Sequence, residues 1–366
     1  MRRALALATA VTLLASGACS AEPDGAGPAA PGSASPPPSS PAPSPSAPAK
    51  GGLGEPKVLV KGRQITWGLA FLPDGHALMT ERRSALLLRV SPAGKVTELG
   101  KVPGVVPHGE GGLLGVAVSP SYRSDRSVYV YFTAASDNRI ARIRYEGGTS
   151  FGRPEVLVEG IPKAVNHNGG RLAFGPDGML YATTGDAAEG RTSQDRESLG
   201  GKILRMTPDG KPAPGNPFGT RVWTWGHRNV QGVAWDESER MYATEFGQDR
   251  FDEVNHIVKG RNYGWPHVEG MAGGDGPYEK PLLTWVPAKA SPSGLAYANG
   301  SLWAAALRGR RLWQVPLDGG KAGEPIPHFQ QRFGRIRSVT PTPDGKALWL
   351  TTDKGEDDGV IVVPLT

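Results

Sequence analysis

The sequence has one cysteine, no run of like charge and almost no long amphipathic helix pattern, and each shortage excludes a class of protein. Cys19 is the only cysteine among 366 residues, so no intramolecular disulfide can form. Basic residues outnumber acidic ones by 41 to 35 but are scattered, with nothing longer than short pairs such as Arg310 and Arg311. Nucleic-acid binding needs clustered Lys and Arg. We therefore interpret the net charge of +6 as a solubility feature and expect no nucleic-acid partner.

Turn residues are abundant instead. The chain has 51 Gly, 34 Pro and only 38% hydrophobic residues, a composition typical of many short strands joined by turns. An apolar strand, a turn such as Pro-Asp-Gly and a second apolar strand with a polar end recur six times, at 68–81, 115–122, 171–186, 232–245, 294–306 and 338–353. Asp-Gly and Asn-Gly steps supply the positive backbone angles that tight hairpins need.

Repeats of this size, each a small antiparallel sheet, stack radially into a propeller. The sequence therefore predicts an all-β fold, a six-bladed β-propeller of four-stranded antiparallel sheets. We place this domain at residues 55–366. The short apolar strand at 58–60 precedes the first repeat, and we expect it to complete the last blade and close the ring.

The first 19 residues have the plan of an export signal, with arginines, an apolar run over 4–14 and then small residues. The position of Cys19 after A-S-G-A resembles the lipobox of bacterial lipoproteins, although Ser16 stands where the pattern prefers Leu. We expect Cys19 to be lipidated and to anchor the protein on the outer face of the bacterial membrane. The alternative is cleavage near Ala18, which gives a secreted soluble protein with a free thiol.

Residues 20–54 form the next segment, which up to residue 50 is almost entirely Ala, Pro, Ser and Gly. Such a composition cannot bury enough apolar area to offset the ordering of the backbone, so we expect a disordered tether. If Cys19 is lipidated, the tether holds the domain away from the surface; with a free thiol it is only a flexible tail.

One pair of motifs suggests acid–base chemistry. N-H-N-G-G-R at 166–171 places His167 on a Gly-flanked loop, and T-T-G-D at 183–186 places Asp186 at the far end of the next strand. A histidine with a carboxylate partner is the arrangement that a general base requires. In a propeller the ends of equivalent strands converge around the axis, so we expect the site there.

The same strand ends carry several cations, namely Arg171, Arg228, Arg308, Arg335 and Arg337. Guanidinium groups directed at one channel would repel each other unless an anion lies among them. The sequence therefore predicts a polyanionic ligand.

Several motifs in order now give a family resemblance: G-G-L-L-G at 111–115, N-H-N-G-G-R, T-G-D, G-H-R-N-x-Q-G at 226–232, E-x-G, D-E-V-N at 252–255, G-x-N-Y-G-W-P at 260–266 and R-I-R before S-V-T-P-T-P-D-G. Together they resemble the soluble dehydrogenases of sugars that depend on pyrroloquinoline quinone (PQQ), the glucose/sorbosone dehydrogenase family. The resemblance covers essentially everything after residue 55. It implies a six-bladed propeller with the quinone and a calcium ion at the top of the channel.

The resemblance implies roles for individual residues. His167 is the base that takes the proton of the anomeric hydroxyl as hydride passes to the quinone, and Asp186 orients its imidazole. Arg228 hydrogen-bonds the reacting quinone carbonyl, with Asn229 beside it.

The resemblance also implies a clamp for the three carboxylates of the quinone, formed by Arg308, Arg335 and Arg337. The family has a lysine near Arg308, so the register there is open. For the R-I-R pair the alternative is a strand with one solvated face, because residues two apart point the same way.

Calcium in this family is held largely by backbone carbonyls, which here implicates Gly247 and Gln248. The ion would polarise the quinone as a Lewis acid. The family commonly has Pro where this chain has Gln248. Two nearby carboxylate segments, Glu245 and 252–253, either shape this loop or are exposed hairpin residues.

Glu110 and Asn166 stand where glucose-oxidising members have an amide and an acidic residue near cofactor and sugar. Both differ in kind, which favours a broader aldose substrate over glucose. His108 is close by, and the simplest interpretation is an exposed loop histidine. The implied reaction is oxidation of an aldose at its anomeric carbon to the lactone, with electrons passed to an external acceptor of unknown identity.

Two other classes of function stay open. A calcium-dependent propeller lactonase also places a metal in the channel, but it normally binds that metal with several Asp, Asn and Glu side chains. A propeller that only binds a glycan or a protein does not need the pairing of His167 with Asp186.

Overall fold

The computed structural model describes residues 51–273 and 276–366. The predicted signal, Cys19 and the tether up to residue 50 lie outside the described residues. Residues 51–54 already pair with the C-terminal end of the chain: Gly52 and Gly54 donate backbone N–H groups to the carbonyls of Thr366 and Pro364, each at 2.9 Å. The folded body therefore includes residues before the predicted boundary at 55.

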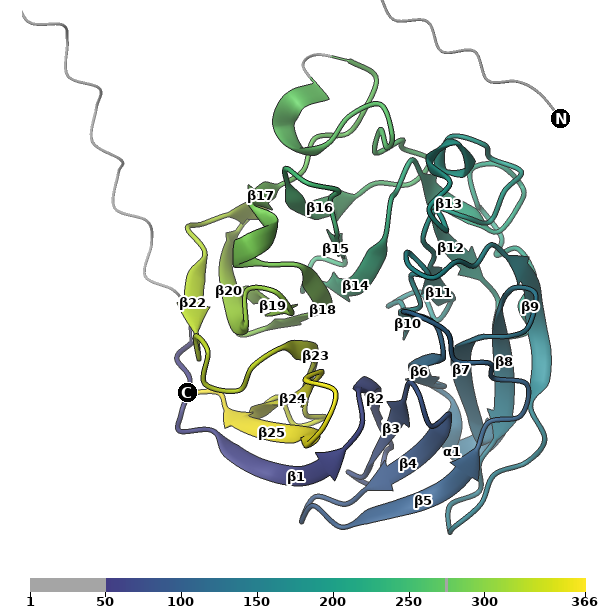
Figure 1. Cartoon of the computed structure of the whole chain (residues 1–366), viewed down its shortest axis with the longest axis vertical. Helices are drawn as coiled ribbons and strands as arrows, with labels where there is room; N and C mark the ends of the chain where they lie inside the picture. Colours follow the sequence, from purple (N-terminus) through teal and green to yellow (C-terminus); the bar gives the residue numbers. More distant parts are fainter. Residues whose placement is uncertain (1–50, 274–275) are drawn as a thin grey trace, which may run out of the picture. The chain divides into compact units, whose positions relative to one another are not determined.

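The described residues form six antiparallel sheets that lie around a common centre (Figure 1). Blade one contains β2 (Thr66–Phe71), β3 (Ala77–Glu81), β4 (Leu86–Val90) and β5 (Val96–Lys101). Blade two contains β6 (Leu113–Val118), β7 (Ser127–Thr133), β8 (Asn138–Arg144) and β9 (Glu155–Ile161). Blade three contains β10 (Leu172–Phe174), β11 (Leu180–Thr183), β12 (Lys202–Met206) and β13 (Val222–Trp225).

The remaining blades complete the ring. Blade four contains β14 (Val230–Trp235), β15 (Met241–Glu245), β16 (Asp252–Ile257) and β17 (Leu283–Trp285). Blade five contains β18 (Pro292–Ala298), β19 (Ser301–Ala306), β20 (Arg311–Asp318), β21 (Lys321–Ala322) and β22 (Ile326–His328). Blade six contains β23 (Ile336–Pro341), β24 (Ala347–Thr352), β25 (Asp358–Pro364) and β1 (Lys57–Arg63). The predicted all-β six-bladed propeller is confirmed.

Two details refine the prediction. β1 pairs antiparallel with β25, so the strand before the first repeat does close the last blade, as expected. Blade five departs from four full strands, because the short strands β21 and β22 both pair with β20.

Helical structure is slight in the described part of the chain. It comprises α1 (Tyr122–Asp125) and the 3₁₀ segments η1 (Gly190–Ser193), η2 (Gly270–Gly273) and η3 (Pro287–Lys289). Among the described residues, no helix has the length and apolar character needed to cross a membrane.

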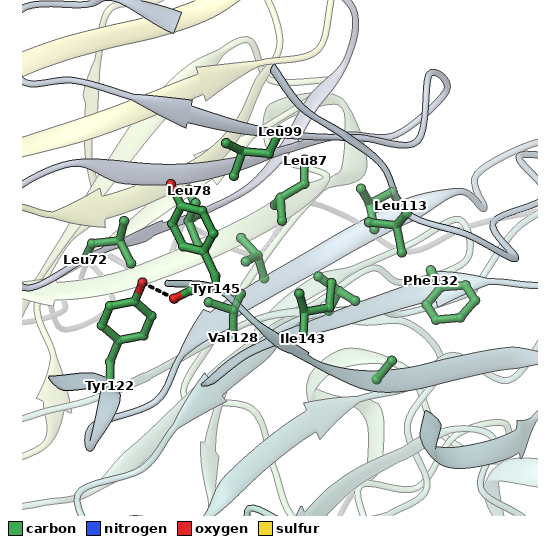
Figure 2. Packing of buried hydrophobic residues seen from close by; sticks show 14 of the residues in the cluster. Leu72, Leu78, Leu87, Leu99, Leu113, Tyr122, Val128, Phe132, Ile143 and Tyr145 are labelled. Atoms are coloured by element: carbon green, nitrogen blue, oxygen red, sulfur yellow. Dashed lines mark hydrogen bonds between the residues drawn. The ribbon is translucent and has the colours of Figure 1, made fainter. Parts of the chain in front are cut away.

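The hydrophobic core is divided among the contacts between blades. Six clusters of buried apolar residues occur, and each is built mainly from two neighbouring blades. Figure 2 shows the cluster in which Leu78 and Leu87 of blade one meet Val128 of blade two. Tyr122 closes it by donating its hydroxyl to the carbonyl of Tyr145 at 2.6 Å. Burial of each such Leu or Val contributes about 1.5–3 kcal/mol, so the ring is stabilised at every junction.

Hydrogen bonds also link the blades near the axis. Threonines on the second strand of three blades donate to a carbonyl on the innermost strand of the next blade: Thr80 to Leu114, Thr183 to Val230 and Thr244 to Ser293, at 2.5, 2.8 and 2.5 Å. The blades approach so closely here that Gly232 of β14 has no room for a side chain, because a Cβ at this position would lie 2.3 Å from the Ser293 carbonyl. The innermost strands are therefore held in register where the predicted site residues begin.

Candidate functional site

A cavity of about 360 Å³ opens where the innermost strands begin. We call it the axial cavity. Trp67, Gln231 and Arg337 contribute to its wall from β2, β14 and β23, and most of the other lining residues lie in loops between strands. Its cationic residues are five arginines: Arg82, Arg228, Arg308, Arg335 and Arg337. Strand ends that are far apart in the sequence therefore meet at one place.

His167 and Asp186 meet at the edge of this cavity. His167 Nδ1 lies 2.7 Å from Asp186 Oδ1, and Asp186 is only 1% exposed. The same Asp186 oxygen accepts the backbone N–H of Ala188 at 2.8 Å, and the other accepts Trp265 Nε1 at 2.7 Å. Because a carboxylate can only accept when it is ionised, Nδ1 is the donor of this contact, and Nε2 of a neutral imidazole is then left as the acceptor. This arrangement suits a base that acts through Nε2.

The loop that carries His167 is fixed from two further sides. The backbone N–H of His167 donates to Glu110 Oε2 at 3.0 Å. Asn229 Oδ1 accepts the N–H of Gly169 at 3.0 Å. Glu110 lines the axial cavity, whereas Asn229 is fully buried and does not line it. The structure thus places Asn229 behind the histidine loop, although its buried Nδ2 has no hydrogen-bond partner.

Arg228 lines the axial cavity, as His167 does, and it is held by several contacts. Its backbone N–H donates to Glu245, which also accepts from His227 Nδ1 at 2.8 Å. Its guanidinium lies 5.3 Å from the Trp265 ring and donates to the Phe246 carbonyl at 3.3 Å. Burial lowers the pKa of Arg228 although nearby carboxylates oppose this. The side chain is therefore a positioned cation with part of its hydrogen-bonding capacity unused.

Two of the three arginines predicted to form the clamp, Arg335 and Arg337, lie beside Asp353. Arg337 forms an ion pair with Asp353 and donates to Gln231 Oε1 at 2.8 Å. Arg335 Nε donates to the Asp353 carbonyl at 3.0 Å. Burial favours protonation of Asp353, but the charges of its arginine neighbours outweigh burial and lower its pKa. Arg337 is 3% exposed, so the alternative of a solvated strand face is wrong for this residue.

Arg82 belongs to the same cluster and was not predicted from the sequence. It is 8% exposed, and burial together with the charge of Arg337 lowers its pKa to about 10. It follows the second strand of the first repeat, so the rule that strand ends carry the site would have found it. Arg171, in contrast, was predicted at the site but does not line the axial cavity. It stacks on Trp67, with Cζ 4.3 Å from the ring centroid.

Charge in the axial cavity is unbalanced. Five arginines face the carboxylates of Glu110, Asp252 and Asp353. The buried Nε atoms of three of the arginines, Arg82, Arg228 and Arg337, have no hydrogen-bond partner. Buried donors of this kind normally have a hydrogen-bond partner. Leaving a buried charged donor without one costs a large amount of free energy. The cavity thus has the donors and the charge to bind a polyanion.

The loop that follows β15 forms another part of the wall. Gly247 and Gln248 both line the axial cavity, and Gly247 donates its N–H to Asp252 Oδ1 at 3.1 Å. Asp252 and Glu245 are buried and bonded to backbone N–H groups, so they shape this region rather than standing exposed on a hairpin. Burial raises the pKa of Asp252 to about 6. Among the described residues, no group of three or more His, Cys, Asp or Glu side chains is placed to hold a metal ion.

A second, wider cavity of about 850 Å³ adjoins the first. We call it the outer groove. His167, Arg228 and Gln248 line both cavities, and Trp265 and Glu269 line only the outer groove. His167 is therefore accessible from a space large enough for a small-molecule ligand. Neither Asn166 nor the exposed His108 lines either cavity.

Comparisons with known proteins agree with this geometry. Residues 63–363 match the family described as Glucose / Sorbosone dehydrogenase. The solved PQQ-bound form of the aldose sugar dehydrogenase from Streptomyces coelicolor is 52% identical, with a TM-score of 0.84, and the match covers 87% of this chain and 99% of that chain.

Curated relatives are more distant. The aldose sugar dehydrogenase YliI of Escherichia coli K12 is 32% identical over 347 residues, 81% of this chain and 90% of its own length. The quinoprotein glucose dehydrogenase B of Acinetobacter calcoaceticus is 31% identical over 74% of this chain and 59% of its own length.

Proposed function

This chain belongs to the glucose/sorbosone dehydrogenase family, and on that premise we propose that it oxidises an aldose at the anomeric carbon to the lactone, using PQQ and passing electrons to an external acceptor. One observation carries the proposal: two features of the site lie next to each other. A histidine with a free Nε2 faces the outer groove, and an axial cavity with surplus arginines lies directly beside it.

The axial cavity fits PQQ, a planar quinone with three carboxylates. Arg82, Arg335 and Arg337 would bind carboxylates, since the guanidinium fork matches a carboxylate in a bidentate manner. Arg308 is exposed at the cavity wall and would close the clamp on the outer side. When bound, the quinone supplies the two-electron acceptor for the hydride that leaves the anomeric carbon.

His167 performs the proton transfer. Its Nε2 takes the proton of the anomeric hydroxyl while the C–H bond of the same carbon breaks, and the oxygen that remains becomes the lactone carbonyl. Asp186 stabilises the imidazolium that forms, and Trp265 keeps Asp186 from rotating away. Arg228 lies where it can stabilise negative charge next to the base.

We also propose a calcium ion at the loop after β15, held by the carbonyls of Gly247 and Gln248. Both residues line the axial cavity, and oxygen ligands of this kind suit Ca²⁺. The ion would act as a Lewis acid toward the bound quinone.

Glu110 is the residue with which we link the choice of substrate. Its carboxylate lines the axial cavity and accepts the N–H of His167, so it lies close to the reacting sugar. Asn166 precedes His167 in the sequence but does not line either cavity. It would contribute only if the sugar extends beyond the cavities. We propose a preference for aldoses broader than glucose.

Export and anchoring stay proposals that rest on the N-terminal sequence. Lipidation of Cys19 would hold the enzyme on the outer face of the membrane and would be its only membrane contact. Labelling of cells with a fatty-acid probe tests this, because a Cys19→Ser variant should lose the label.

The direct test is reconstitution. Apo-protein is mixed with Ca²⁺ and PQQ, and reduction of a dye acceptor is followed with a panel of aldoses. Sugar-dependent reduction that needs PQQ is the expected result. If PQQ neither binds nor supports turnover, the arginine cluster is wrongly interpreted; hydrolysis of a lactone would then favour the lactonase, and glycan binding without turnover would favour a binding protein.

A further inference from the structure

Glu269 makes an unusual set of contacts with the loop after β15. Its Oε1 accepts the backbone N–H groups of four consecutive residues, Gln248, Asp249, Arg250 and Phe251, at 2.8, 3.2, 3.0 and 3.1 Å. Hydrogen bonds from N–H groups to a carboxylate are among the stronger ones in proteins. One side chain from a different segment therefore fixes the whole loop.

We propose that Glu269 is a positioning residue that sets the direction of the two carbonyls proposed to bind calcium. This inference rests on the proposed function and concerns a residue that the sequence analysis did not single out. In each peptide unit the N–H and the C=O point in opposite directions across the trans bond.

The two carbonyls belong to peptide units that Glu269 holds. The Gly247 carbonyl shares its peptide with the N–H of Gln248, and the Gln248 carbonyl shares its peptide with the N–H of Asp249. Both N–H groups point at Glu269, so both carbonyls point away from it. Glu269 lines the outer groove, whereas Gly247 lines the axial cavity.

The loop closes tightly around the carboxylate. A Cβ added at Gly247 would lie 1.8 Å from the Phe251 carbonyl and 2.6 Å from Glu269 Oε1. Only glycine fits at this position without displacing the backbone. The close approach means that a shift of the carboxylate would shift the carbonyls too.

Glu269 is itself held by a short turn. His267 donates its N–H to the Gly264 carbonyl at 2.7 Å, and Gly270 donates to Glu253 Oε1 at 2.7 Å. The same turn carries Trp265, whose indole orients Asp186. One segment, 264–270, therefore positions both the partner of the base and the proposed cation loop.

The test compares three variants of the full chain. Glu269→Ala removes the acceptor, and Glu269→Gln keeps an oxygen but removes the charge. Asp249→Asn is the matched control, because it removes a charge from the same loop, and among the described residues its carboxylate accepts a hydrogen bond only from Gln248 Nε2, at 3.3 Å. Calcium binding is measured by titration calorimetry with and without PQQ, and hydrogen exchange of amides 248–251 is followed in the presence of a chelator.

We expect Glu269→Ala to raise the calcium dissociation constant about 10-fold or more, as loss of a residue that orients metal ligands typically does. Glu269→Gln should fall between wild type and Glu269→Ala, and Asp249→Asn should stay within about 2-fold of wild type, since an exposed charge contributes little. Amides 248–251 should exchange faster in Glu269→Ala.

Three results would contradict the proposal, each in a different way. If the amides exchange faster in Glu269→Ala but calcium binds as in wild type, Glu269 does not set the carbonyls, and the calcium site itself stands. If wild type binds PQQ but no calcium, the calcium proposal fails and the role of Glu269 falls with it. If Glu269→Ala does not fold, Glu269→Gln decides: a loss of affinity no greater than that of Asp249→Asn contradicts the proposal.

Discussion

At one end of the propeller channel the innermost strands begin, and at the other end the same six strands finish. The first end holds the axial cavity with its five arginines and His167. The far end holds a cavity of about 440 Å³ lined mostly by apolar side chains, among them Leu69, Val116, Leu172 and Val233. Arg171 is the only charged residue that lines the far cavity in the described part of the chain.

The difference shows how one repeat supplies both stability and chemistry. Each innermost strand packs its apolar residues toward the far end and between blades, where burial stabilises the ring. The charged residues of the axial cavity lie mostly in the loops next to these strands rather than among the core residues. Arginines that would destabilise a core are therefore concentrated at one end, where a bound anion can compensate their charge.

The largest expected effect comes from removing the base. His167→Ala should lower kcat by about 10²–10⁴-fold, the usual contribution of a general base, while PQQ affinity changes little. The matched control is His108→Ala, because His108 is an exposed histidine on a loop near Glu110. Steady-state kinetics and PQQ titration check this, and equal activity of both variants would contradict the assignment.

Removal of an arginine from the axial cavity should give the next largest effect. In Arg337→Ala the carboxylate of Asp353 loses its closest ion pair and remains buried. Arg335 remains 3.8 Å from that carboxylate, so we expect a loss below the about 3–5 kcal/mol of a buried charge with no partner. PQQ should bind far more weakly. Urea unfolding and fluorescence titration with PQQ measure both losses; unchanged PQQ affinity would remove Arg337 from the clamp.

The far end should respond in the opposite way. Leu172 is 3% exposed and packs in the core between blades two and three. Leu172→Ala should lower the free energy of unfolding by about 2–5 kcal/mol, because it leaves a void, yet kcat and KM of the folded enzyme should stay near wild type. A fall in PQQ affinity would show that the two ends are coupled, which the comparison of the cavities does not predict.

Much of the fold and part of the candidate site could be predicted from the sequence. The repeated strand–turn–strand pattern predicts the blades, because its period and turn residues are local. The pairing of His167 with Asp186 is also nearly local, since the two lie 19 residues apart and on either side of the hairpin of β10 and β11. Arg335 and Arg337 are two residues apart, so their common direction could be expected from strand alternation, although Arg335 directly precedes β23.

Other contacts were not accessible because they join distant segments. Arg337 reaches Gln231 across 106 residues, and no local pattern specifies that pair. Glu269 looks like an ordinary turn residue until its four backbone partners are seen. The resemblance implied a place for Asn229 at the cofactor, but no local pattern specified that its Oδ1 accepts the N–H of Gly169, 60 residues away.

The smallest predicted effect is a pH dependence of the free energy of unfolding that originates at the site end of the channel. Burial, and then the charge of Glu245, raises the pKa of Glu253, which lies beneath the site. Between its ordinary pKa of about 4.3 and the raised value in the folded state, the folded protein keeps a proton that the unfolded chain has released. Stability therefore falls as pH rises through this window, by at most about 1.4 kcal/mol per pH unit for this group.

Glu253→Gln should remove that loss. The amide keeps an oxygen for the N–H of Gly270 but carries no charge to bury. We expect thermal unfolding of the variant and of wild type to agree near pH 5 and the variant to be more stable near pH 8. Glu237, which lies outside the site, serves as control, and Glu237→Gln should leave the pH dependence unchanged. If both variants follow the wild-type curve, the alkaline loss of stability does not originate at the site end of the channel.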